Sequence, residues 1–222
     1  MDFLKRMITM SKKILILHIS LLLLLPSLTF AETFSLNLRY TSPSQVSSTD
    51  SNIKIGISNI TDKRQRENKS LFGERINYSG SKDYFAPAGI SVEDAVTGMV
   101  AEYFKKRGFQ GKRVEKWDLD ANNLKGDWGD IVVGGEILEL WSDVMSKFMS
   151  NKHTVKAKLK IVIADPKEKR ILLTDTITTS LEMTEPLFHE ESVEKMINEA
   201  ASSCIDNILE NNTLKKILSE AK

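Results

Sequence analysis

The chain is short of several residue types on which particular classes of protein depend. One cysteine among 222 residues allows neither an internal disulfide nor an all-cysteine metal site. Three histidines, none in a His-Glu-x-x-His arrangement, supply no closely spaced pair of metal ligands. The 31 basic residues nearly balance the 30 acidic ones, so no net field favours nucleic acid. These shortages exclude disulfide-rich scaffolds, zinc ribbons and strongly basic nucleic-acid-binding domains.

Motifs that carry catalysis are also missing from the sequence. There is no Gly-x-Ser-x-Gly turn, and Gly134-Gly135 is not followed by the Lys-Ser/Thr of a phosphate-binding loop. Many carboxylates are present, but no spacing singles out a pair that would share a site. We therefore expect a non-catalytic protein with no cofactor and no metal. An unrecognised hydrolase is the least favoured alternative, and it requires two carboxylates with perturbed pKa values in one pocket.

Residues 1–31 have the pattern of a secretory signal peptide. A basic pair, Lys12-Lys13, precedes an apolar run from Ile14 to Leu25, and small residues stand where a cut after Ala31 requires them. The apolar run is shorter than the roughly 20 residues that span a bilayer, so cleavage is favoured over membrane anchoring. We expect an exported chain whose remaining residues, 32–222, form one domain.

Hydrophobic periodicity predicts several strands in this domain. Apolar residues alternate with polar ones from Phe34 to Tyr40 and again from Ile53 to Ile57, which is typical of half-buried strands. Further strands are predicted over Phe109–Trp117, Asp130–Trp141, His153–Ile163 and Arg170–Met183.

Two segments have the three- and four-residue apolar spacing of amphipathic helices. One covers residues 91–107, where Ser91 and Asp94 can form a capping box, and the other begins at Ser192. Together with the succession of strands they predict an α+β fold. Its sheet should be mixed but mainly antiparallel, with both helices packed on one face.

The longest stretch without periodicity is a polar loop at about residues 62–90. Long irregular loops in compact domains are usually functional or mobile, and a hairpin inside this one is an alternative. At its start, the Asp62 carboxylate and the Arg64 guanidinium can pair and pin the loop. The alternative is that Asp62 only begins a turn.

A row of lysines is the sharpest charge feature. Lys156, Lys158 and Lys160 alternate with apolar residues and therefore share one face of a predicted strand. Such a row can contact anionic lipid or a polyanionic glycan. The favoured interpretation is a solvated strand face, where lysine also discourages edge pairing.

The remaining candidate functional residues are a cysteine, a histidine followed by two glutamates, and several aromatic residues. Cys204 lies on the apolar stripe of the last helix, so we expect a buried structural thiol. His189-Glu190-Glu191 brings metal-capable groups together, but acidic residues before a helix are favoured by its dipole alone. Aromatic residues either form an interaction surface or fill the core, and the sequence leaves this open for Trp117, Trp128, Trp141, Tyr84 and Phe85.

The order of these features resembles the YajG-type family of bacterial envelope lipoproteins. The resemblance rests on the strand ending in Ser58-Asn-Ile-Thr-Asp-Lys-Arg64, on Leu71-Phe-Gly73-Glu-Arg75, and on the helix ending in Lys106-Arg-Gly108-Phe109. The first strand and the last helix follow the same order, so the resemblance covers nearly all of residues 34–218. A weaker resemblance is to the α/β domains of accessory proteins that activate peptidoglycan synthases.

The resemblance implies a small envelope domain with no established activity, and it transfers no catalytic residue. Family members carry a lipid-modified cysteine at the mature N-terminus, whereas this chain has Ala31-Glu32. We therefore expect no lipid anchor and a soluble periplasmic protein, with the periphery of the outer membrane as an alternative location. The expected partner is another envelope protein, and a glycan or an anionic lipid is the alternative. The residues expected at this partner or ligand surface are Asp62, Arg64, Gly73, Arg75, Lys156, Lys158 and Lys160.

Overall fold

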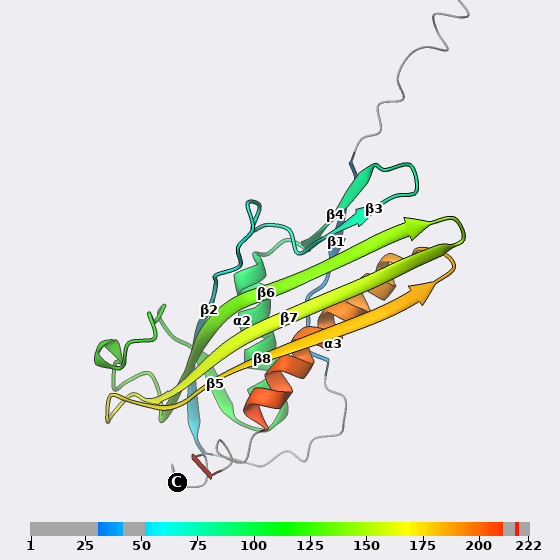
Figure 1. The fold of residues 1–222 in the computed structure, drawn as a ribbon. Helices are drawn as coiled ribbons and strands as arrows, with labels where there is room; N and C mark the ends of the chain where they lie inside the picture. The colour runs from blue at the N-terminus through cyan, green and yellow to red at the C-terminus, as the bar shows by residue number, and fades with distance from the viewer. Residues whose placement is uncertain (1–30, 42–51, 211–215, 218–222) are drawn as a thin grey trace, which may run out of the picture. The chain divides into compact units, whose positions relative to one another are not determined.

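One mixed sheet of eight strands and two covering helices make up the described part of the chain (Figure 1). The computed structural model describes residues 31–41, 52–210 and 216–217. The elements are β1 (Thr33–Leu36), β2 (Lys54–Asp62), β3 (Gly73–Ile76), β4 (Lys82–Pro87), α2 (Val92–Lys106), β5 (Gln110–Arg113), η1 (Ala121–Asn123), β6 (Ile131–Lys147), β7 (Ser150–Asp165), β8 (Arg170–Glu185) and α3 (Glu190–Leu209).

Strand β6 organises the sheet because its 17 residues are long enough to serve two sets of partners. Along one edge it pairs antiparallel with β7, and β7 pairs antiparallel with β8. Along the other edge its first half pairs parallel with β2, and its second half pairs parallel with β3. Beyond these, β5 follows β2, while β4 and then β1 follow β3. The predicted mixed, mainly antiparallel sheet is confirmed, since the two longest ladders are antiparallel.

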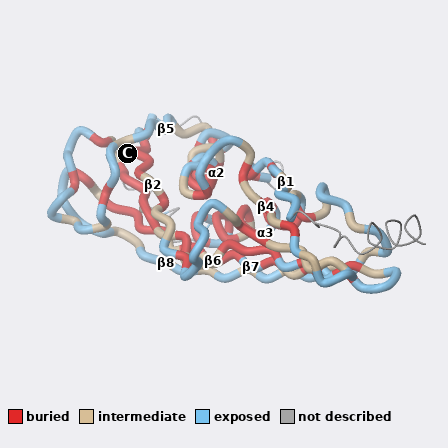
Figure 2. The backbone as a smooth tube through the Cα atoms, turned by 90° about the horizontal axis from the view of Figure 1, so that it is seen from above, coloured by how far each residue is buried: buried red, intermediate tan, exposed pale blue. Residues whose placement is uncertain are grey.

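Both helices cover the same face of the sheet, as predicted, and the main hydrophobic core lies between the two layers (Figure 2). Helix α2 begins where the sequence indicates: the Ser91 hydroxyl accepts a hydrogen bond from the Asp94 backbone N–H at 3.0 Å. Helix α3 begins two residues before the predicted Ser192. The thiol of Cys204 is fully buried in this core, which confirms the prediction, and burial raises its pKa.

A second, smaller core covers part of the opposite face. Trp117, Leu124 and Trp128, from the segment between β5 and β6, pack on Val132 and Val162. Phe85 is buried in the main core. Most of the aromatic residues that the sequence left open therefore fill cores.

The strand predicted over Phe34–Tyr40 ends at Leu36, and the residues after it dock on α3 instead of on a strand. The backbone N–H groups of alternate residues donate to side chains four apart along the helix: Asn37 to Glu194, Arg39 to Asn198 and Thr41 to Ser202, each at 2.9 Å. Two extended residues advance about 6.6 Å and four helical residues about 6 Å, so the two repeats match. Alternation was therefore a correct sign of extended backbone but a wrong sign of sheet pairing.

Other predictions for the strands and the long loop are also refined. The strand predicted over Phe109–Trp117 is limited to β5, because the chain then turns away to build the second core. Strand β6 runs on from Trp141 to Lys147, where β3 supplies its new partner. The alternative reading of the 62–90 loop is confirmed, since β3 and β4 form an antiparallel hairpin within it.

Candidate functional site

Exposed apolar side chains are concentrated at one end of the sheet. Seven large hydrophobic residues are exposed among those that the structure describes, and five of them lie in or beside three loops at this end. We call this group the apolar tip; it consists of Tyr78, Met145, Phe148, Met149 and Leu187. Concentrated apolar exposure of this kind marks interaction surfaces, whereas scattered single residues do not.

Strand register brings the three loops together. Ile76 pairs with Met145, so the β3–β4 turn lies beside the β6–β7 turn, and the rings of Tyr78 and Phe148 are 6.5 Å apart. Asn151 pairs with Glu185, so the link from β8 to α3, which carries Leu187, lies on the other side. The apolar tip is thus assembled from segments far apart in the sequence (Figure 1).

The β6–β7 turn places apolar residues where local preferences disfavour them. Lys147 pairs with Ser150, so Phe148 and Met149 form a two-residue turn, and they are 78% and 77% exposed. Met149 has a φ of 60°, in the left-handed region that such turns normally fill with glycine or asparagine. That conformation costs a side-chain-bearing residue about 1–2 kcal/mol. Strain and apolar exposure at one turn are typical of a position that serves function rather than folding.

Hydrogen bonds beneath the apolar tip hold the loops in place. The Arg75 Nε donates to the Ser146 hydroxyl at 2.9 Å, and that hydroxyl donates to the Asn151 side-chain oxygen at 2.6 Å. The Asn151 amide then donates to the Pro186 carbonyl at 3.2 Å. One chain of bonds therefore connects β3, both ends of the β6–β7 hairpin and the link to α3. The apolar tip rests on fixed loops.

A buried histidine lies below this chain of bonds. His153 stacks on Phe188 at a centroid distance of 6.2 Å, and the Arg75 guanidinium lies over the same Phe188 ring at 3.9 Å. The His153 Nε2 is 2.9 Å from a carboxylate oxygen of Glu185. Burial lowers the pKa of His153, although the Glu185 carboxylate acts in the opposite direction. Arg75, a residue expected at a partner surface, therefore lies directly under the apolar tip.

A hollow of about 400 Å³ adjoins the apolar tip on the sheet face that the helices leave open. Ile76 and Met145 contribute apolar surface to it, and Lys147 and Lys152 lie among its lining residues. Lys152 pairs with Glu182 at 3.0 Å. The apolar tip thus has a mixed polar margin.

The predicted lysine row lies further along the same open face. Lys160 is neutralised by Glu136 at 3.1 Å, and Lys158 lies opposite Glu139 in the β6–β7 ladder. Among the described residues no ion pair engages Lys156 or Lys158. The row and the apolar tip are separate features of one sheet face.

Asp62, Arg64 and Gly73 were also predicted at the partner surface, and each makes contacts that stabilise the fold. The Arg64 guanidinium is 2% exposed; it bonds both carboxylate oxygens of Asp62, at 3.0 and 2.8 Å, and the carbonyls of Lys69, Leu71 and Leu140. Partial burial tends to raise the pKa of Asp62, but the hydrogen bonds and charge of Arg64 outweigh it, so the pKa is lowered. Asp62 and Arg64 thus pin the start of the loop.

Gly73 is also buried, and its role is steric. A Cβ at this position would lie 2.5 Å from the Ser142 carbonyl oxygen and 2.7 Å from the Phe85 ring. Glycine therefore allows β3 to approach β6 closely. Both Gly73 and the Arg64 side chain are buried in this structure.

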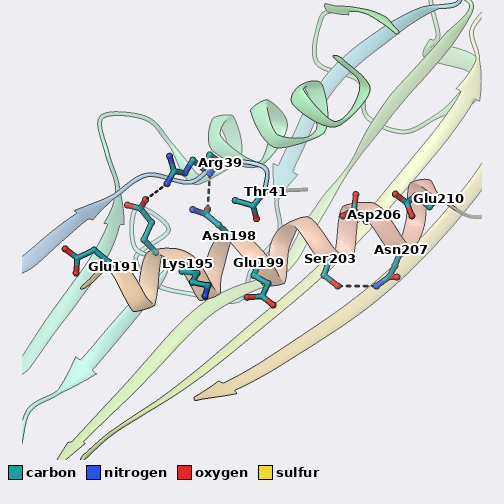
Figure 3. Close-up of a pocket in the computed structure, with 11 residues that line it drawn as sticks. Arg39, Thr41, Glu191, Lys195, Asn198, Glu199, Ser203, Asp206, Asn207 and Glu210 are labelled. Atoms are coloured by element: carbon teal, nitrogen blue, oxygen red, sulfur yellow. Dashed lines mark hydrogen bonds and ion pairs between the residues drawn. The ribbon is translucent and has the colours of Figure 1, made fainter. Parts of the chain in front are cut away.

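A groove of about 690 Å³ follows α3 (Figure 3). Its polar lining has a structural explanation, because Glu194 and Asn198 belong to the ladder that docks residues 37–41. At its end the Tyr40 hydroxyl donates to Asp206, and burial raises the pKa of Asp206 even though Tyr40 and Arg107 oppose the effect. The groove is built by the docking of one segment of the chain on another.

Two properties of the described residues bear on whether the protein binds a metal or crosses a membrane. No group of three or more His, Cys, Asp or Glu side chains is placed to share a metal ion in this part of the chain. In the described part of the chain, neither α2 nor α3 is long and apolar enough to cross a bilayer.

No protein-family model and no curated protein matches the sequence. Solved structures match the fold. Protein XCC0632 from Xanthomonas campestris, of family DUF330, has a TM-score of 0.53 and 10% identity, covering 86% of this chain and 99% of that one. This likeness shows a shared α+β fold.

Two further structures score lower. A homologue of a neuraminyllactose-binding hemagglutinin from Helicobacter pylori has a TM-score of 0.47 and 12% identity over 84% of this chain and 97% of that one. The PelC dodecamer from Paraburkholderia phytofirmans has a TM-score of 0.42 and 12% identity over 77% and 94%. These scores are too low to establish a common fold. The sequence resemblance to the YajG-type family stays a prediction.

The residues of the apolar tip were not predicted from the sequence. One signal was available: Phe148-Met149 stands between the polar runs Ser146-Lys147 and Ser150-Asn151-Lys152, where a tight turn would be expected to carry glycine or asparagine. Tyr78 and Leu187 carry no such signal, because only the fold brings them beside this turn.

Proposed function

We propose that the protein is a non-catalytic, exported accessory domain of the bacterial envelope that acts by binding through its apolar tip. One observation carries the proposal: most of the exposed large hydrophobic side chains of the described chain project from three fixed loops at one end. A soluble domain gains no folding stability from apolar side chains in water, so their concentration indicates a bound state in which they are covered.

Three features support the proposal. The signal-like segment indicates export. The hydrogen-bond chain through Arg75, Ser146 and Asn151 keeps the loops ordered, which reduces the entropic cost of binding. The left-handed Met149 occupies the turn despite the local cost of this backbone conformation.

The test compares two single substitutions at exposed apolar residues. Phe148→Ser changes the apolar tip, and Ile90→Ser changes a 52% exposed residue beyond the far end of β4. Cells producing either variant are separated into soluble and envelope fractions, and the protein in each is quantified by immunoblot. We expect F148S to shift from the envelope to the soluble fraction and I90S to distribute like wild type. Equal distributions of all three proteins would remove the proposal.

The lysine row supports a second candidate, the binding of an anionic glycan or lipid. The observation in its favour is that Lys156 and Lys158 lie on the open face without an ion pair among the described residues, while Lys160 is neutralised by Glu136. Charge reversal at Lys156 and Lys158 should then reduce retention on peptidoglycan or on anionic vesicles. Unchanged retention would sink this candidate.

A further inference from the structure

The geometry points to a lipid bilayer surface as the ligand of the apolar tip, with Phe148 and Met149 entering the interfacial region. This inference rests on the proposed function and names its ligand. Three observations support it: the composition of the apolar tip, its charges and the position of the first described residues.

The composition is that of side chains that favour a membrane interface. Tyrosine and lysine combine an apolar body with a polar end, so they suit the boundary between lipid and water. Phenylalanine, leucine and methionine gain from entering the apolar region itself. Here Phe148 and Met149 form the very end of the long β6–β7 hairpin, while Tyr78 and Leu187 stand on the neighbouring loops.

The charges around the apolar tip neither exclude lipid nor provide the main attraction. Lys82 pairs with Glu74 at 3.1 Å, and Lys152 pairs with Glu182 at 3.0 Å. Lys147 has no ion pair among the described residues. Asp143, which lines the same hollow and also has no ion pair among the described residues, offsets this lysine, so apolar insertion should supply most of the affinity.

The chain enters the domain at the same end. The Tyr84 N–H donates to the Glu32 carbonyl at 2.8 Å, and the Glu32 N–H lies 3.3 Å from a carboxylate oxygen of Asp83. Asp83 pairs with Arg75, one register step from the pair Ile76–Lys82 that precedes the turn carrying Tyr78. The first residues that the structure describes therefore lie beside the apolar tip.

The test reads penetration directly by placing a tryptophan at the apolar tip. Phe148→Trp and the matched control Ile90→Trp are prepared from the protein as cells process it. Each is mixed with phosphatidylcholine vesicles whose acyl chains carry bromine, a contact quencher of tryptophan fluorescence. Wild type supplies the background of the three native tryptophans. A parallel set of vesicles contains phosphatidylglycerol, and the affinities of F148S and I90S are measured by co-sedimentation on unbrominated vesicles.

We expect the emission of F148W to shift to shorter wavelength and to be quenched by brominated lipid, and that of I90W to do neither. The substitution F148S should weaken vesicle binding about tenfold or more, because burying a phenylalanine side chain contributes about 1.5–3 kcal/mol. Binding should persist on uncharged vesicles and change little with phosphatidylglycerol.

Three results would overturn the inference. Equal quenching of F148W and I90W would show general adsorption rather than insertion of the apolar tip. Absence of vesicle binding, with F148S still lost from the envelope fraction, would leave the proposed function standing and assign the apolar tip to a protein partner. A blue shift of F148W that grows with protein concentration without vesicles would identify a second copy of the chain as the occupant.

Discussion

Replacing Asn198 by alanine should weaken the fold by removing the centre of the ladder that docks residues 37–41 on α3. The Asn198 side chain is 1% exposed; it accepts from the Arg39 N–H and donates to the Asn37 carbonyl, both at 2.9 Å. A net hydrogen bond contributes about 1 kcal/mol, and a partner left partly buried adds to the loss. We therefore expect N198A to lower the free energy of unfolding by about 2–3 kcal/mol.

The matched control is Asn207→Ala, on the exposed face of the same helix. Alanine favours helix formation over asparagine by several tenths of a kcal/mol, and both variants gain this equally. The Asn207 amide makes an exposed bond of 3.3 Å to Ser203, so N207A should change stability by less than about 0.5 kcal/mol. With a urea dependence of about 2 kcal/mol per molar, the N198A midpoint should fall by roughly 1 M.

Urea unfolding followed by circular dichroism measures both midpoints under identical conditions. If N198A and N207A unfold at the same urea concentration, the docking of residues 37–41 contributes nothing to stability. The reasoning that matches a two-residue extended repeat to a four-residue helical repeat would then be refuted.

Three further predictions concern buried groups. Burial lowers the pKa of His153, so the unfolded chain binds more protons than the folded one below about pH 6.5. The free energy of unfolding, measured by urea unfolding at each pH, should therefore fall as the pH is lowered from 7 towards 5, and this pH dependence should be weaker in His153→Gln than in wild type. Arg64→Met removes the ion pair of the part-buried Asp62 carboxylate and the donor to the Leu140 carbonyl, so it should lower the unfolding free energy by about 2–3 kcal/mol; a thermal midpoint close to wild type would contradict the role of this pair. The Cys204 thiol should react with a disulfide reagent only as fast as the protein unfolds, and rapid reaction of the native protein would disprove its burial.

Much of the fold was predictable because local signals and the tertiary structure agree. The capping box at Ser91 begins α2, and the alternation from His153 to Ile163 places the apolar residues of β7 in the core and its lysines on the open face. The thiol of Cys204 is buried because its helical position lies on the apolar stripe. In each case a few neighbouring residues determine the outcome, so the sequence alone carries the information.

The errors arise where partners are distant in the sequence. The alternation from Phe34 to Tyr40 correctly indicates extended backbone, but it cannot distinguish a strand neighbour from the side chains of a helix about 160 residues later. The burial of Arg64 could not be predicted from the local pattern, because its carbonyl acceptor at Leu140 lies 76 residues later. The apolar tip was missed because three loops meet only in the folded chain.

The apolar tip also shows what a broken local rule indicates. A two-residue turn with Phe148 and Met149 in place of glycine or asparagine contributes nothing to the folding of the hairpin and exposes two large apolar side chains. Such a position is explained by a bound state more readily than by the free one.

The central claim, that the apolar tip is the binding surface, is tested most directly by the distribution of F148S and I90S between soluble and envelope fractions. Both residues are exposed and apolar, so neither substitution should alter the unfolding midpoint, and only one lies at the apolar tip. The account predicts that F148S leaves the envelope fraction while I90S remains with wild type. Retention of F148S at the wild-type level, with its fold intact, would contradict it.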